Sequence, residues 1–222
     1  MQQMKIRKTQ IVLILCFWTA CINDTGKTVS NWYSSKPEFI RLNHDTITAS
    51  GWRIEYLTKQ DSSDLFINWT KNNINAQYID SGVLKLRSDF VPHFGAENES
   101  NIFMPHRCAS DCEALLVLSK TLLKARDFSH LVSYTAKFDK ALTVHASSYE
   151  IDDGTYKIVL TDLKTFMDTI LQFKNLALGS FKVGYIDSIR FDEGKTYISA
   201  NLIDKTDYYR QRTIRETKVI SF

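Results

Sequence analysis

The chain has 222 residues, a formal net charge of +3, 44% hydrophobic residues and 12% aromatic residues. This length and composition allow a packed core without obligatory disulfides, and they exclude an intrinsically disordered chain. Three of the 28 basic residues, Lys5, Arg7 and Lys8, lie in the first 20 residues, which contain no acidic residue. The rest of the chain is therefore formally neutral, which argues against nucleic-acid binding, because such proteins usually carry a basic face.

Two motifs compete at the N-terminus. Residues 26–28, Gly-Lys-Thr, end like a phosphate-binding P-loop, but Cys21 stands where the loop needs its opening glycine. The alternative is a secretion signal, in which a basic leader, an apolar run and the small pair at 19–20 precede Cys21. The secretion signal accounts for more of the residues, so 1–20 are predicted to be a signal peptide.

The sequence Phe-Trp-Thr-Ala-Cys at 17–21 resembles the lipobox of bacterial lipoproteins. The resemblance implies cleavage between Ala20 and Cys21, a thioether-linked lipid on Cys21 with acyl groups such as palmitate, and anchorage to a membrane of the bacterial cell envelope. An ordinary secretory signal cleaved at the same place, with Cys21 free and the protein secreted, is the alternative. In either case residues 21–36 are expected to form a flexible tether.

The chain after the tether begins with expected strands, because short β-prone runs alternate there with polar and glycine-containing segments. These strands cover 52–57, 65–69, 75–79 and 83–87. A loop-like stretch containing Pro92 and Gly95 follows.

Two segments are predicted to be helices. The first, about 110–127, begins with a capping-box pattern at Ser110 and places leucines along one stripe. The second, about 162–174, follows a capping residue, Thr161 or Asp162, and repeats apolar residues at helical spacing.

The remaining segments are predicted to be strands joined by hairpin turns. The strands are expected at 141–151, 155–160, 181–191, 195–203 and 213–222, with turns at 152–154 and 192–194. Turns rather than crossover helices between most strands favour a single α+β domain over 37–222, with an antiparallel-rich sheet and two helices. A β-sandwich-like first half joined to an α+β second half is the alternative, with a subdivision near 128–140 as a variant.

Cys108 and Cys112 lie four residues apart at the start of the first expected helix. In an exported protein the oxidising compartment favours a disulfide between them. A redox pair is a sharper hypothesis, because a helix N-terminus and the neighbouring His106 and Arg107 would lower the pKa of the Cys112 thiol. The spacing differs from the C-x-x-C of thioredoxin-like enzymes, however, so the sequence favours a structural disulfide.

A zinc or copper site could draw on His106, Cys108, Cys112 and His93, but only the two cysteines have short-range spacing. The histidines lack metalloprotease spacing, and no G-x-S-x-G motif marks a catalytic serine. No catalytic residue, metal or cofactor is therefore assigned, and an enzyme is the less favoured class. Residues 207–216, rich in Tyr and Arg, are interpreted as a loop and an edge strand rather than a nucleic-acid surface.

The sequence thus predicts a lipid-anchored cell-envelope protein that binds a ligand or another protein. Thiol–disulfide or metal handling at Cys108 and Cys112 is one alternative, and a structural envelope subunit is another. No sequence feature identifies the ligand, the partner, the membrane or the leaflet.

Overall fold

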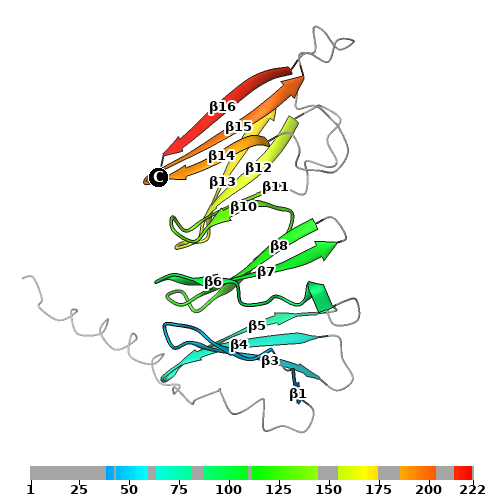
Figure 1. Ribbon diagram of the computed structural model, residues 1–222, viewed down its shortest axis with the longest axis vertical. Coiled ribbons are helices and arrows are strands. Elements are labelled where there is room, and N and C mark those ends of the chain that lie inside the picture. Colours follow the sequence, from blue (N-terminus) through cyan, green and yellow to red (C-terminus); the bar gives the residue numbers. More distant parts are fainter. Residues whose placement is uncertain are drawn as a thin grey trace, which may run out of the picture.

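The computed structural model describes residues 39–42, 44–59, 64–81, 88–109, 112–144, 155–174, 186–203 and 213–221. Within these residues the protein consists of antiparallel strands, loops and one short 3-10 helix, η3 (Ser88–Phe90). The strands form four sheets. Figure 1 shows these sheets stacked along the long axis of the molecule in the order in which the chain forms them.

Each sheet is built mostly from strands that are neighbours in sequence. The first sheet contains β1 (Phe39–Arg41), β2 (Thr46–Ile47), β3 (Arg53–Lys59), β4 (Leu65–Lys71) and β5 (Ile74–Asp80). The second contains β6 (Ala96–Glu97), β7 (Asn101–Ala109), β8 (Cys112–Ser119) and β9 (Ala125–Phe128). The third contains β10 (Leu131–Thr135), β11 (Lys140–Val144), β12 (Thr155–Asp162) and β13 (Met167–Lys174). The fourth contains β14 (Ile186–Asp192), β15 (Lys195–Ile203) and β16 (Thr213–Ser221).

Three apolar cores lie between successive sheets. The core between the first and second sheets includes Trp69 of β4 and Leu116 of β8. The core between the second and third sheets includes Leu115 of β8, and the core between the third and fourth includes Leu160 and Ile198. Because side chains alternate across a strand, the neighbours Leu115 and Leu116 enter different cores. The two inner sheets therefore pack against other sheets on both faces, although Met167 and Ile170 of β13 remain exposed.

The outer face of the fourth sheet is mostly polar, with Val219 as an exposed apolar residue. The Arg190 guanidinium lies 4.1 Å from the ring centroid of Tyr197, and the Ser199 hydroxyl lies 2.7 Å from that of Thr217. These residues alternate along their strands with the apolar side chains that face the third sheet. A polar outer face allows the stack to end at this sheet in contact with water, as terminal units of repeat proteins do.

Both predicted helices are wrong. Residues 112–119 form β8, and a turn in which Leu123 has a φ of 53° leads into β9. The leucine-rich run is continuous because β8 is buried on both faces, and periodicity cannot separate such a strand from a buried helix. The expected helix at 110–127 is therefore a hairpin in the centre of the stack.

The segment 162–174 is likewise a hairpin. The Asp162 carboxylate accepts hydrogen bonds from the backbone amides of Lys164 at 2.9 Å and Thr165 at 3.2 Å. Asp162 therefore caps a turn rather than a helix, and Phe166, with a φ of 58°, closes that turn before β13 begins. The α+β class and its alternative with an α+β second half are both incorrect, because the described residues form an all-β structure.

Most predicted strands of the first and last sheets are confirmed. The segments 52–57, 65–69, 75–79, 195–203 and 213–222 correspond to β3, β4, β5, β15 and β16, with residue 222 outside the described residues. The turn expected at 192–194 joins β14 to β15, with Gly194 at a φ of 70°. The strand expected at 83–87 and the turn at 152–154 lie outside the described residues.

Candidate functional site

The β7–β8 hairpin contains most of the residues that were predicted from the sequence to form a disulfide, a redox pair or a metal site. Arg107 pairs with Glu113, and Ala109 pairs with Cys112, with a register shift between the two pairs. The shift is a bulge at Cys108, which brings the Cys108 and Cys112 Cα atoms to 5.1 Å, and a disulfide joins the two residues. The bridge therefore closes a hairpin and does not lie at a helix N-terminus.

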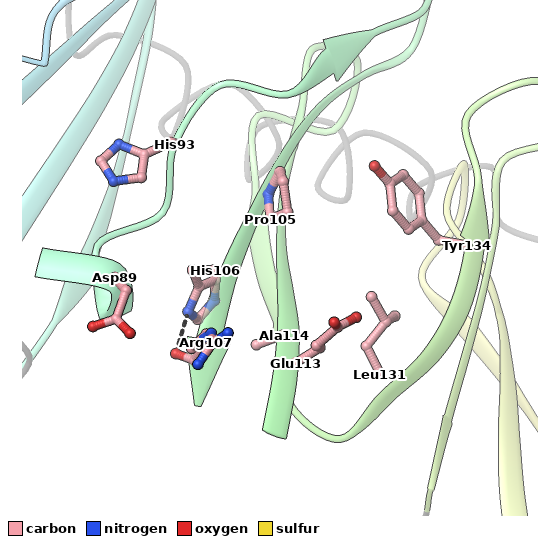
Figure 2. A pocket seen from close by; sticks show the side chains of 9 residues that line it. All are labelled: Asp89, His93, Pro105, His106, Arg107, Glu113, Ala114, Leu131 and Tyr134. Atoms are coloured by element: carbon pink, nitrogen blue, oxygen red, sulfur yellow. Dashed lines mark hydrogen bonds between the residues drawn. The ribbon is translucent and has the colours of Figure 1, made fainter. Parts of the chain in front are cut away.

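An open hollow of about 550 Å³ lies beside this hairpin. Figure 2 shows Asp89, His93 and His106 on one side of Pro105, with Glu113 and Tyr134 on the other. The polar side chains are spread around the rim and do not converge on one point. Such an arrangement of both charges, imidazoles and an aromatic ring suits binding of a polar ligand or a protein segment better than catalysis at a single atom.

His106 is held by two acceptors. Its Nε2 lies 3.0 Å from the Asp127 carboxylate, and its Nδ1 lies 3.0 Å from the Arg107 carbonyl oxygen. Only the protonated imidazole can donate to both. Burial alone would lower the pKa of His106, but the hydrogen bond and the charge of Asp127 outweigh burial, so this pKa is raised.

The His106–Asp127 pair contacts the first sheet through Tyr78 and Asp80 of β5. The Tyr78 side chain hydrogen-bonds with Asp127 and with Asp80. Burial, followed by the negative charge of Asp127, raises the pKa values of both Tyr78 and Asp80. Four titratable side chains from β5, β7 and β9 therefore form one polar cluster between the first two sheets.

The proposed metal ligands are not assembled into a metal site. Both cysteine sulfurs belong to the disulfide, and both His106 nitrogens face other acceptors. The His93 ring contacts the ring of His44, with a centroid distance of 5.0 Å. Within the described ranges, no group of three or more His, Cys, Asp or Glu side chains is placed to hold a metal ion.

Some residues of this region were not identified from the sequence. Asp127, His130 and Tyr134 approach the β7–β8 hairpin from other strands and from the turn before β10. Their separation in sequence leaves no motif, because pairing of β9 with β8 brings Asp127 and His130 close, and packing of the third sheet brings Tyr134 close. Cys21, predicted to carry lipid, lies outside the described residues. No helix in the described part of the chain is long and apolar enough to cross a membrane.

The described residues define a class of structure, an all-β protein of stacked antiparallel sheets with a disulfide-closed hairpin in its second sheet. No protein-family model, no curated protein and no solved structure matches this chain. Functional inference therefore depends on the site itself.

Proposed function

We propose that this protein is exported, anchored to an envelope membrane through lipid on Cys21, and binds a polar ligand or a segment of another protein in the hollow beside β7. The observation that carries the export step is the Cys108–Cys112 disulfide. Disulfides persist in oxidising compartments outside the cytoplasm, which agrees with a signal peptide ahead of Cys21.

The hollow supports the binding step. It is bordered by the exposed side chains of Arg107 and Glu113, and by Tyr134, which stacks on the buried ring of Phe103 at a centroid distance of 5.7 Å. Phe103 is fully buried, so it fixes the position of the Tyr134 ring at the rim. A positioned aromatic ring between charged groups is a frequent arrangement at protein-binding surfaces.

The lipid anchor is tested by labelling cells with a fatty acid that carries a detectable tag. The wild-type protein should take up the label and fractionate with membranes, whereas Cys21→Ser should lose the label and leave the membrane fraction. Cys108→Ser, which leaves the lipidation signal intact, is the matched control and should remain labelled. Label that persists in Cys21→Ser would contradict the proposed anchor.

The binding step is tested by placing a photo-crosslinking amino acid at Tyr134 in living cells. A matched control has the same amino acid at Tyr197, on the polar outer face of the fourth sheet. We expect a discrete adduct from position 134 and none from position 197. Equal adducts at both positions, or none at position 134, would favour a structural subunit without a binding hollow.

A further inference from the structure

The two sulfurs of the Cys108–Cys112 bridge have unequal surroundings. Cys112 lies in β8 and is only 9% exposed, whereas Cys108 is half-buried in the bulge of β7. An incoming thiol therefore reaches Cys108 more easily than Cys112. If it attacks Cys108, Cys112 is the sulfur that leaves.

His130 lies beside the leaving sulfur. Its Nδ1 is 3.6 Å from the Cys112 Sγ, within the reach of a hydrogen bond that involves sulfur. The imidazole comes from the short connection between β9 and β10, not from the hairpin that contains the bridge. A protonated imidazole at this distance favours a thiolate on Cys112 over a neutral thiol.

The backbone holds His130 in an uncommon conformation. Its φ is 54°, in the left-handed region that residues other than glycine rarely adopt, and its carbonyl oxygen accepts a hydrogen bond of 3.0 Å from the Val144 amide. Strained residues of this kind cluster at functional sites, where the surrounding structure compensates for their cost. The backbone of His130 is thus tied to β11 of the third sheet.

We propose that the Cys108–Cys112 bridge is an exchangeable disulfide that oxidises pairs of thiols in exported proteins, with Cys108 as the attacked sulfur and His130 as the residue that stabilises the departing Cys112 thiolate. This activity goes beyond ligand binding in the hollow and does not depend on it. It also differs from a redox pair at a helix N-terminus, because the stabilising charge comes from a side chain in the connection between β9 and β10.

The exchange is balanced in two steps. A substrate thiolate attacks the Cys108 Sγ and forms a mixed disulfide, while the electron pair of the broken bond stays on Cys112 beside protonated His130. The second substrate thiol loses its proton to solvent and attacks the substrate sulfur of the mixed disulfide, which releases Cys108 as a thiolate. The substrate dithiol is oxidised to a disulfide, and the bridge is reduced to two thiols.

The test uses the full chain with Cys16→Ser and Cys21→Ser, so that only the bridge cysteines remain. This protein and its His130→Asn derivative are equilibrated with reduced and oxidised glutathione, and free thiols are counted by alkylation and mass spectrometry. Asparagine tolerates a positive φ and cannot carry a positive charge, so it preserves the backbone while it removes the imidazole. His44→Gln, at an exposed histidine between β1 and β2 of the first sheet and outside the hollow, is the matched control.

We expect His130→Asn to make the bridge harder to reduce, by a factor that approaches about tenfold only at a pH where the Cys112 thiol is ionised, because the reduced protein loses stabilisation of its thiolate form. The control should match the parent. An equilibrium constant that is the same for both proteins at every pH would overturn the proposal. A bridge that stays closed in the folded parent protein at every glutathione ratio would also overturn it, because such a bridge is structural.

Single-cysteine variants provide a second measurement if His130→Asn does not fold. In the same background, Cys108→Ser leaves Cys112 next to His130, and Cys112→Ser leaves Cys108 without it. Ultraviolet absorbance of the thiolate, followed against pH, should place ionisation of Cys112 about one pH unit below that of Cys108. Equal values, or a lower value for Cys108, would contradict the role of His130.

Discussion

The side-chain amide of Asn101 donates a hydrogen bond of 2.8 Å to the Asp139 carboxylate, which joins the second sheet to the β10–β11 turn of the third. The same amide donates to the Leu163 carbonyl oxygen at 3.2 Å. Asn101 is fully buried and Asp139 is 4% exposed. Buried hydrogen bonds to a charged group make larger contributions to stability than neutral ones, so this pair is expected to hold the two inner sheets together.

Asn101→Ala should lower the free energy of unfolding by about 2 kcal/mol, because it leaves the Asp139 carboxylate without one of its buried donors. Asp139→Asn is the suitable partner substitution, since Asp139 has a φ of 53° and asparagine accepts that backbone. Urea unfolding of both single variants and the double variant gives the coupling energy. Strictly additive effects would contradict a direct contribution of the pair.

Because β8 lies in the interior, truncating a buried side chain on either face of this strand should destabilise the protein by a similar amount. Leu115→Ala and Leu116→Ala should each cost roughly 3 kcal/mol, because both side chains are fully buried, in different cores. Leu122→Ala should cost less than about 0.5 kcal/mol, because Leu122 is 40% exposed in the following turn. Thermal and urea unfolding measure all three. A large cost for Leu122 would instead support the helix that the leucine spacing suggested.

The Glu97–Lys120 pair predicts sensitivity to acid. Burial alone would raise the pKa of Glu97, but hydrogen bonds from Lys120 and Ser50 outweigh burial and lower this pKa to about 2. A lowered folded-state pKa means that the ion contributes stability above about pH 4.5, and that this contribution is lost as the pH falls toward 2. The free energy of unfolding should therefore fall more steeply with decreasing pH between about pH 4.5 and pH 2.

Glu97→Gln should lower stability by about 3 kcal/mol at neutral pH, because the Lys120 ammonium, 5% exposed, loses its charged partner. The difference from the wild type should disappear as the pH approaches 2. Glu193→Gln in the exposed β14–β15 turn is the control. A difference that stays constant from neutral pH to pH 2 would show that the carboxylate charge has no role.

The cluster around His106 predicts the opposite dependence on pH. Because the folded-state pKa of His106 is raised, its contribution to stability is present below about pH 6.5 and is lost as the pH rises through the folded value. Asp80, whose pKa is also raised, acts in the same direction at lower pH. Contact between the first two sheets should therefore weaken in alkaline solution. The weakening is expected at the polar cluster, where His106 lies next to Tyr78, Asp80 and Asp127.

His106→Gln should flatten this dependence, because glutamine keeps a hydrogen-bond donor near Asp127 but does not titrate. Hydrogen exchange of the β5 amides, measured between about pH 6 and 9, reports opening of the first sheet from the second. The exposed His93→Gln variant should behave like the wild type. Identical pH profiles for wild type and His106→Gln would exclude His106 as the titrating group.

The strands at the two ends of the stack were predictable because they show local signals. β3, β4 and β5 are short β-prone runs separated by polar turns, and Gly194 marks the β14–β15 hairpin. The residues of the candidate site were harder to predict from the sequence. Cys108 and Cys112 were found from their spacing alone, but His130 lies 18 residues from Cys112 and reaches it only because β9 pairs with β8 and the chain then turns into β10.

The sequence by itself determined the neutral composition of the chain after its leader, the cysteine spacing and the turn-rich strand pattern of the outer sheets. Only the tertiary structure decided the state of the two leucine- and isoleucine-containing segments at 112–119 and 167–174. Local propensity permits helix or strand in such runs; the first run shows no alternation, and in the second the alternation of Leu171 and Phe173 with polar residues is interrupted by Ile170. β8 becomes a strand because sheets on both sides bury it, and β13 because it pairs along its whole length with β12.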